Sequence, residues 1–154
     1  MNSVKQFVVR ENGDNEFYSH QEAQDFVASK AAYFRSKGWD GLAENLEVQE
    51  RDCGYVTESG YSDAYPYEIV RVVSDKCIEI RALNAELLNG DELKFHVGGF
   101  SSHCSNQRAQ EYRYSSNPDA GLLKVRLNKH GNWVHKGRRF SLAEKPYKFH
   151  DYNF

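Results

Sequence analysis

The sequence predicts an α+β fold that is mainly β: a small SH3-like or Tudor-like barrel, or a sandwich, with an N-terminal hairpin and an amphipathic helix. Three observations lead to this fold class. After residue 53, stretches of alternating apolar and polar residues recur roughly every eight to twelve positions, separated by turn residues. Ten tyrosines and an aromatic fraction of 14% suit half-buried pleated surfaces. Before residue 53, one segment has helical periodicity instead.

The segment before residue 53 predicts a β-hairpin followed by one helix. Two short strands, 5–10 and 16–18, flank the turn signal Asn12-Gly13. The sequence Ser19-His20-Gln21-Glu22 has the capping-box form, so we expect a helix to begin there and to end at Gly38. Residues 39–52 form a connector or hold a short helix over 42–48. An apolar stripe at helical spacing supports the long helix: Ala23, Phe26, Val27, Ala31 and Phe34.

Residues 53–154 predict a barrel-like domain that forms one compact unit, with residues 1–52 as its hairpin-and-helix appendage. Residues 84–92 are expected to be a loop. The aromatic stretch 147–154 is expected to be a last strand that packs on the sheet and closes it. The other expected strands cover 55–58, 65–73, 77–83, 93–97, 111–114, 122–128, 133–136 and 139–142.

Length, charge and cysteine usage limit the function classes. A chain of 154 residues can bury a core without metals or disulfides. The net charge of −2 argues against a strongly basic nucleic-acid binder and against an acidic DNA mimic, although a local basic patch stays open. The chain has three widely spaced cysteines, no signal pattern and no apolar run of about 20 residues. These features predict a cytoplasmic protein without membrane contact.

The stretch GGFSSHCSNQ, residues 98–107, concentrates reactive and polar side chains. His103, Cys104, Asn106 and Gln107 lie within five positions, after two glycines that free the backbone. Because the stretch lies between two β-rich halves, we expect a shaped loop on a rigid scaffold, where functional residues are common.

Four stretches of the chain resemble a group of small proteins found on phages, prophages and mobile elements and in their bacterial hosts. They are YSDAYPYEIVRV (61–72), the loop 98–107, EYRY (111–114) and the ending FHDYNF (149–154), so the resemblance covers residues 53–154. The group shares an Asp-x-x-x-Tyr strand start, a Gly-Gly…Cys-x-Asn-Gln loop and a Tyr-Asp-x-Asn-Phe terminus, in which this chain has His150 first. The resemblance implies an accessory role, often against host defence, and no particular mechanism.

Cys104 raises an alternative, enzymatic hypothesis. A cysteine nucleophile needs a base within hydrogen-bond reach, and Asn106 would orient that base. The fold would have to supply the base from one of four histidines: His96, His130, His135 or His150. The simpler interpretation is an inert thiol packed beneath the loop, since free cysteine is among the most buried residue types.

Metal and cofactor sites are not expected. His96, His103 and Cys104, even joined by Cys53 or Cys77, lack the close ligand pairs that zinc sites use. Phosphate-loop and dinucleotide motifs are also missing from the sequence.

Two C-terminal hairpins concentrate basic residues with aromatic residues between them. Basic side chains beside exposed aromatic rings can hold phosphates and stack on bases, although a solvated sheet face is the simpler interpretation. Asp63 is expected to stabilise a turn, with a catalytic carboxylate as the alternative. The residues predicted to bind a partner are Asp63, Tyr65, His103, Asn106, Gln107, Lys124, Arg126, Trp133, Arg138 and Arg139.

We therefore expect a non-enzymatic accessory protein that binds a host protein or a nucleic acid through the loop 98–107 and the basic hairpins. Inhibition of a bacterial defence system is the most specific form of this prediction. Two alternatives stay open: a small cysteine-dependent enzyme that uses Cys104, and a protein that sequesters a nucleotide-like ligand in the barrel mouth. The sequence leaves the oligomeric state open.

Overall fold

The computed structural model describes residues 2–11, 13–17, 19–98 and 101–154. The chain divides into two compact units, Val4–Cys53 and Gly54–Phe154, and residues 1–3 belong to the second. The sequence predicted a division after residue 52. Parts of two predicted features lie outside the described residues: Asn12 and Tyr18 of the first hairpin, and Gly99 and Phe100 of the loop 98–107.

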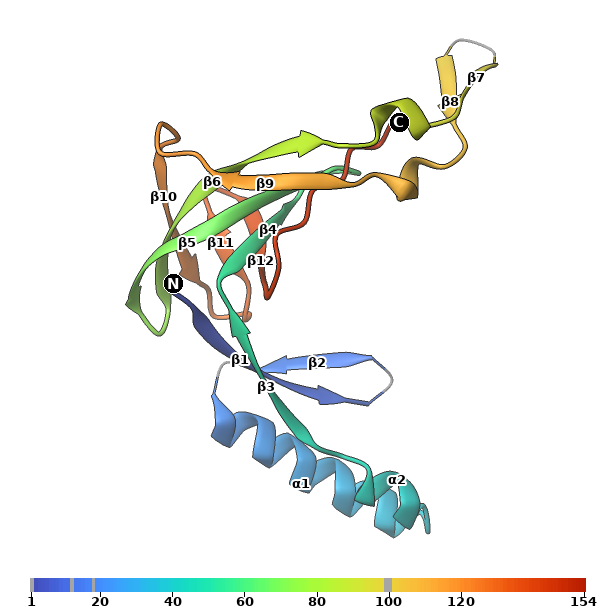
Figure 1. The fold of residues 1–154 in the computed structure, drawn as a ribbon. Coiled ribbons are helices and arrows are strands. Elements are labelled where there is room, and N and C mark those ends of the chain that lie inside the picture. Colours follow the sequence, from blue (N-terminus) through green and yellow to red (C-terminus); the bar gives the residue numbers. More distant parts are fainter. Residues whose placement is uncertain (1, 12, 18, 99–100) are drawn as a thin grey trace. The chain divides into compact units, whose positions relative to one another are not determined.

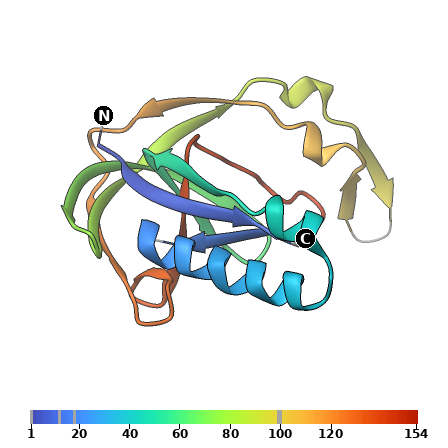
Figure 2. The ribbon, with the colours of Figure 1, turned by 90° about the horizontal axis from the view of Figure 1, so that it is seen from below.

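The unit Val4–Cys53 is a three-stranded antiparallel sheet with two helices. Its strands are β1 (Val4–Arg10), β2 (Asp14–Phe17) and β3 (Val48–Cys53), in the order β2-β1-β3. The helices are α1 (His20–Ser36) and α2 (Asp40–Glu44), and Figure 2 shows α1 running alongside β1 and β2. Ala31, Phe34 and Ala43 form the buried cluster that joins the two helices.

The start and end predicted for α1 are confirmed. The Ser19 hydroxyl accepts a hydrogen bond from the Glu22 backbone N–H at 3.1 Å, as a capping box requires. Gly38 follows the helix with φ +74°, the left-handed conformation that glycine adopts most readily. The expectation for 39–52 is wrong in part, because the second helix is Asp40–Glu44 and β3 follows it.

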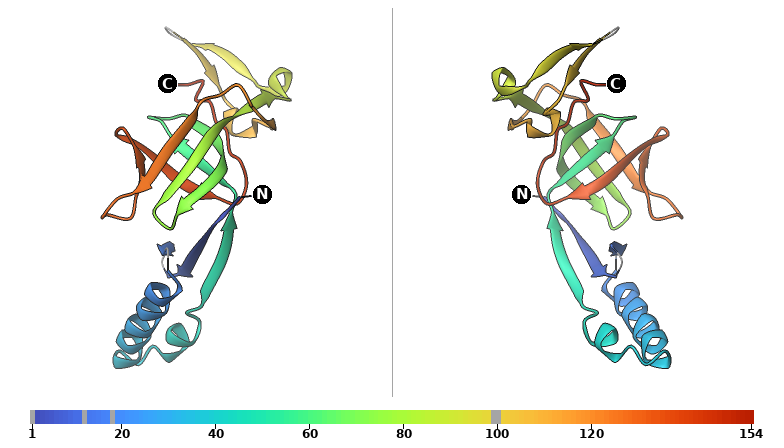
Figure 3. Two further views of the ribbon diagram at one scale, coloured as in Figure 1. Left: turned by 90° about the vertical axis from the view of Figure 1, so that its left-hand side faces the viewer. Right: turned by 90° about the vertical axis from the view of Figure 1, so that its right-hand side faces the viewer.

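Six strands of Gly54–Phe154 close into an antiparallel barrel within the described residues (Figures 1 and 3). Because β10 pairs with both β11 and β6, the ring has no free edge. This confirms the predicted fold class. The six are β4 (Tyr55–Ser59), β5 (Ala64–Ser74), β6 (Cys77–Leu87), β10 (Leu122–Leu127), β11 (Trp133–His135) and β12 (Arg138–Ala143).

The barrel core comes from alternate residues of these strands. Val56 faces Tyr67 and Leu142 across its two ladders, and the same face continues around the ring. The buried large apolar residues of this face are Val56, Tyr67, Ile69, Ile78, Ile80, Val125, Trp133, Phe140 and Leu142.

An excursion from the barrel separates β6 from β10. The second half of β6 pairs with β9 (Tyr112–Ser116), from Leu83↔Ser116 to Leu87↔Tyr112. Between them the chain forms two 3₁₀ turns, Gly90–Glu92 and Gln107–Ala109, and the strands β7 (Phe95–Gly98) and β8 (Ser101–Cys104). The expectation of a loop over 84–92 is therefore wrong for residues 84–87, which β9 holds in a ladder.

The prediction of a last strand over residues 147–154 is also wrong. This segment makes a single β-bridge, between Phe149 and Ala64, and the barrel closes through β6 and β10 instead. Tyr147 and Phe154 stay exposed. Among the described residues, no helix is both long and apolar enough to cross a bilayer.

Candidate docking site

Strands β7 and β8 form an isolated antiparallel hairpin, which we call the hairpin finger (Figure 1). Phe95 lies opposite Cys104, and His96 lies opposite His103. Since neighbouring residues of a strand point to opposite faces, Phe95 and Cys104 share one face and the two histidines share the other. The finger therefore has an apolar face and an imidazole face.

The apolar face packs at its base and is open further out. The rings of Phe95 and Tyr152 meet edge to face with centroids 5.2 Å apart, and Cys104 is only 1% exposed. Phe95 nevertheless keeps 48% of its surface in solvent, and Val97 is fully exposed. A fully exposed valine beside a half-exposed phenylalanine makes the outer finger an apolar surface without cover in the described structure.

Two carboxamide side chains fix the base of the finger. Asn106 accepts from the Lys94 backbone N–H at 2.7 Å and donates to the Glu92 carbonyl at 3.0 Å. Asn153 accepts from the Cys104 backbone N–H at 2.6 Å and donates to the Cys104 carbonyl at 2.9 Å. Each amide thus satisfies one backbone donor and one backbone acceptor, as a neighbouring strand would.

Two further carboxamides repeat this arrangement next to the finger. Gln110 accepts from the His150 backbone N–H at 3.1 Å and donates to the carbonyl of the same residue at 2.7 Å. Asn89, which is buried, accepts from the Glu111 N–H at 2.9 Å and donates to the Ala109 carbonyl at 2.6 Å. We call Asn89, Asn106, Gln110 and Asn153 the carboxamide clamps.

Asp63 and Gln107 add acceptors for the same C-terminal segment. Asp63 accepts from the Asp151 N–H at 2.7 Å and from the Tyr65 hydroxyl at 3.0 Å, and Gln107 accepts from the Tyr152 N–H at 2.9 Å. The backbone hydrogen bond from Asp151, more than any other contact, lowers the pKa of the Asp63 carboxyl. Four of the predicted binding residues in this region, Asp63, Tyr65, Asn106 and Gln107, thus form internal hydrogen bonds.

The chain matches no family model, no curated protein and no solved structure. Four residues of the stretches that carry the sequence resemblance accept hydrogen bonds from backbone N–H groups. Asn106 and Asn153 do so at the base of the finger, and Asp63 and Gln107 do so along the C-terminal segment.

No histidine ring among the described residues forms a hydrogen bond with the Cys104 thiol. Its Sγ lies 3.7 Å from the Asn106 Oδ1, and His96 is on the opposite face of the finger, where its Nε2 meets the Ser105 hydroxyl at 3.1 Å. The Nδ1 atoms of His135 and His150 meet the Lys124 carbonyl and Asp63 instead. Within the described part of the chain, the geometry pairs Cys104 with Asn106 and leaves the thiol without a base.

The predicted basic residues do not form one surface with the finger. In Figure 1 the strands β10 and β11 lie at the other end of Gly54–Phe154 from β7 and β8. Trp133 is 1% exposed in the barrel core, so the expectation that it is an exposed stacking ring is wrong. Arg138 shares the inward face of β12 with Phe140. Lys124, Arg126 and Arg139 remain on the surface.

A polar cluster at one end of the barrel was not predicted. The Arg138 guanidinium donates to both oxygens of Glu58 and, at 2.7 Å, to the Tyr67 hydroxyl, which donates to Glu58 at 2.8 Å. The hydrogen bonds from Arg138 lower the pKa of Glu58, and burial, helped by Glu58, raises the pKa of Tyr67 to about 12. The sequence does contain a signal for this cluster. Arg138, Phe140 and Leu142 alternate along one strand, so the arginine points inward with two core residues.

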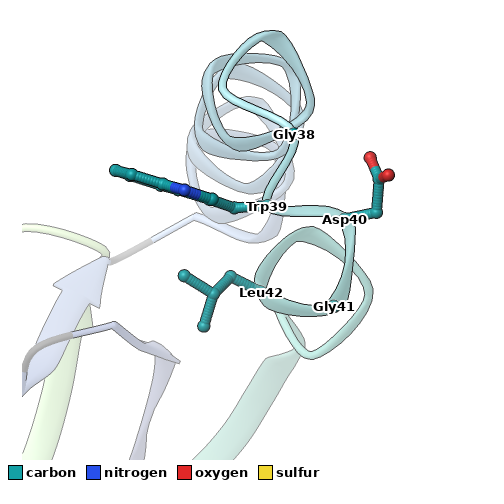
Figure 4. Close-up of a pocket in the computed structure, with 5 residues that line it drawn as sticks. All are labelled: Gly38, Trp39, Asp40, Gly41 and Leu42. Atoms are coloured by element: carbon teal, nitrogen blue, oxygen red, sulfur yellow. The ribbon is translucent and has the colours of Figure 1, made fainter.

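A surface hollow in Val4–Cys53 was also missed. It is lined by Gly38, Trp39, Asp40, Gly41 and Leu42. Figure 4 shows the side chains of Trp39 and Leu42 on one side and that of Asp40 pointing away. Trp39 and Leu42 are about half exposed. Among the described residues, no three His, Cys, Asp or Glu side chains gather as a metal site.

Proposed function

We propose that the protein is a non-enzymatic binding protein that docks on a bacterial host protein through the hairpin finger. In the setting that the sequence resemblance implies, it acts for a phage or mobile element in the host cytoplasm, and a component of host defence is the favoured target. The observation that carries the proposal is the exposed apolar pair Phe95 and Val97 on a hairpin with a clamped base.

The clamps favour binding because they limit the entropy cost of docking. A hairpin of two strands is at best marginally stable on its own, so an unsupported finger would have to become ordered on contact. Hydrogen bonds from the Lys94 and Cys104 backbone N–H groups to Asn106 and Asn153 hold the backbone before any partner arrives. A preorganised contact element loses less conformational freedom on association.

The open strand edges of the finger favour a protein as the partner. Within the described residues, β7 and β8 pair with no other strand, so β7, and β8 except at Cys104, have an edge where a partner strand can add. Asn153 already fills this role at Cys104, where its amide takes the place of a peptide group from a third strand. The apolar side chains of Phe95 and Val97 would supply the buried contacts.

A photo-cross-linking amino acid at position 97, introduced into the full chain and expressed in a bacterial host, tests this proposal. We expect one discrete protein adduct that excess unmodified protein competes away. A Phe95→Ser/Val97→Ser variant should fail to compete, while a Cys104→Ser variant should compete fully.

The matched control carries the cross-linker at the exposed strand position Asn84 of β6. The same adduct from position 84, or no competable adduct from position 97, contradicts docking by the finger. Loss of competition by Cys104→Ser with the fold intact would favour the cysteine-dependent alternative.

A further inference from the structure

Positive charge is concentrated in one continuous part of the chain, residues 122–143. This segment holds six lysines and arginines and neither Asp nor Glu, whereas the remainder has 14 basic and 22 acidic residues. The net charge of −2 therefore hides a strong asymmetry. The segment comprises β10, β11, β12 and their two turns, all within the barrel.

The ladders place two arginines of this segment in one row on the outside of the barrel. Arg126 lies opposite Val134, and Val134 lies opposite Arg139. The neighbours Trp133 and Phe140 are buried inside, so the row faces outward, and both arginines are exposed. Because adjacent strands are about 4.8 Å apart, the two Cα atoms are roughly 10 Å apart.

The row contains no acidic side chain. On the side of β6, Arg126 lies opposite Cys77, and beyond Val134 the row ends at Arg139. Glu79, the acid of the next row along β6, pairs with Arg71 at 2.9 Å and with Lys124 at 3.7 Å. Among the described residues, neither arginine of the row forms an ion pair.

Two further lysines lie in the turns on either side of β11. Lys129 lies in the turn between β10 and β11, and Lys136 lies in the turn between β11 and β12. Both are exposed, and neither forms an ion pair within the described part of the chain. Arg126, Lys129, Lys136 and Arg139 are therefore four cations available to an external anion, and we call them the basic face.

We infer that the basic face binds the phosphate backbone of a nucleic-acid duplex without reading its sequence. Planar guanidinium groups match phosphate oxygens, and several cations on one surface gain from the release of counterions. The aromatic neighbours of the row, Trp133 and Phe140, are buried, so base stacking contributes nothing there. This inference does not depend on the proposed function, because the hairpin finger is a different element.

Binding of a 20-base-pair DNA duplex of mixed sequence to the full chain, measured from 20 to 200 mM salt, tests the inference. Four phosphate contacts predict a slope of log K against log salt of about −3.6. An Arg126→Gln/Arg139→Gln variant should reduce the magnitude of this slope by about 1.8 and should weaken binding about tenfold or more at low salt. A Lys37→Gln/Arg113→Gln variant makes the same charge change elsewhere and should bind as the unchanged protein does.

The inference is overturned by no binding at 20 mM salt, by a slope that the arginine variant leaves unchanged, or by equal losses of affinity in the two double variants. Equal affinity for polyglutamate would assign the face to an acidic protein instead and overturn it too. Thermal unfolding of each variant verifies that the barrel is intact. A Phe95→Ser/Val97→Ser variant should retain duplex binding, so failure of finger docking and failure of this inference are distinguishable.

Discussion

Substitution of Asn153 tests whether one carboxamide fixes the base of the hairpin finger. Asn153→Ala removes both the acceptor for the Cys104 N–H and the donor to the Cys104 carbonyl. At about 1 kcal/mol for each hydrogen bond, the local free energy of opening falls by about 2 kcal/mol. The Cys104 amide should then exchange with solvent deuterium about 30-fold faster, because about 1.4 kcal/mol corresponds to a factor of ten.

Amide hydrogen exchange read by NMR gives this rate residue by residue. Amides of the barrel strands, such as that of Ile80, should exchange as before, since the loss is confined to the finger. The control Asn84→Ala removes an exposed asparagine of β6 that takes no part in the clamps. It should leave the Cys104 rate unchanged.

A second variant separates the donor from the acceptor. Asn153→Asp keeps the acceptor for the Cys104 N–H and sets a negative oxygen against the Cys104 carbonyl, so we expect it to protect Cys104 no better than alanine does. An exchange rate within twofold of that of the unchanged protein, for either variant, refutes the clamp.

Three further predictions concern the elements around the site. Glu58→Gln should make the free energy of unfolding less sensitive to acid. The pKa of Glu58 is lower in the folded state than the value of 4.5 in the unfolded chain, so its carboxylate stabilises the fold above pH 4.5. This stabilisation is lost as the pH falls through the folded pKa. Lys136→Asn should raise the free energy of unfolding by about 0.5–1 kcal/mol, because Lys136 has φ 46° in a two-residue hairpin turn that suits Asn-Gly. Ser19→Ala should destabilise α1 by about 1 kcal/mol, because it removes the N-cap.

Each of these predictions has a direct measurement. For Glu58→Gln, the free energy of unfolding is measured with denaturant at a series of acidic pH values. If it falls with pH as steeply as that of the unchanged protein, Arg138 does not hold the Glu58 carboxylate. A denaturant midpoint for Lys136→Asn below that of the unchanged protein would show that the backbone at Lys136 is not strained. For Ser19→Ala, the helical circular dichroism signal should be lost at a lower denaturant concentration than for the control Ser36→Ala. Equal midpoints would argue against the cap.

Local patterns predicted the elements that depend on near neighbours. The capping box at Ser19 placed α1, and the alternation over 77–83 and 122–128 placed most of β6 and β10. The inward position of Arg138 was also encoded locally, since it has the same parity as Phe140 and Leu142. These features need only residues within a few positions of one another.

Long-range pairing explains what the sequence did not predict. Only one residue of β3, Cys53, is buried, and pairing with β1 makes this polar segment a strand. The carboxamide clamps join residues far apart in the chain, such as Cys104 and Asn153, and no spacing rule links them. Asn106 and Gln107 stood out as candidates by residue type. Their backbone partners, Glu92 and Lys94 for Asn106 and Tyr152 for Gln107, depend on how the chain folds around them.

Docking by the finger requires that the finger is rigid before it meets a partner. Backbone ¹⁵N relaxation of the described finger residues, Phe95–Val97 and Ser102–Cys104, measures this rigidity on the picosecond to nanosecond timescale. The clamps predict order parameters of about 0.85, equal to those of the barrel strands. Order parameters below about 0.6 at these amides would contradict a preorganised finger, because a finger that moves freely is not held by its clamps.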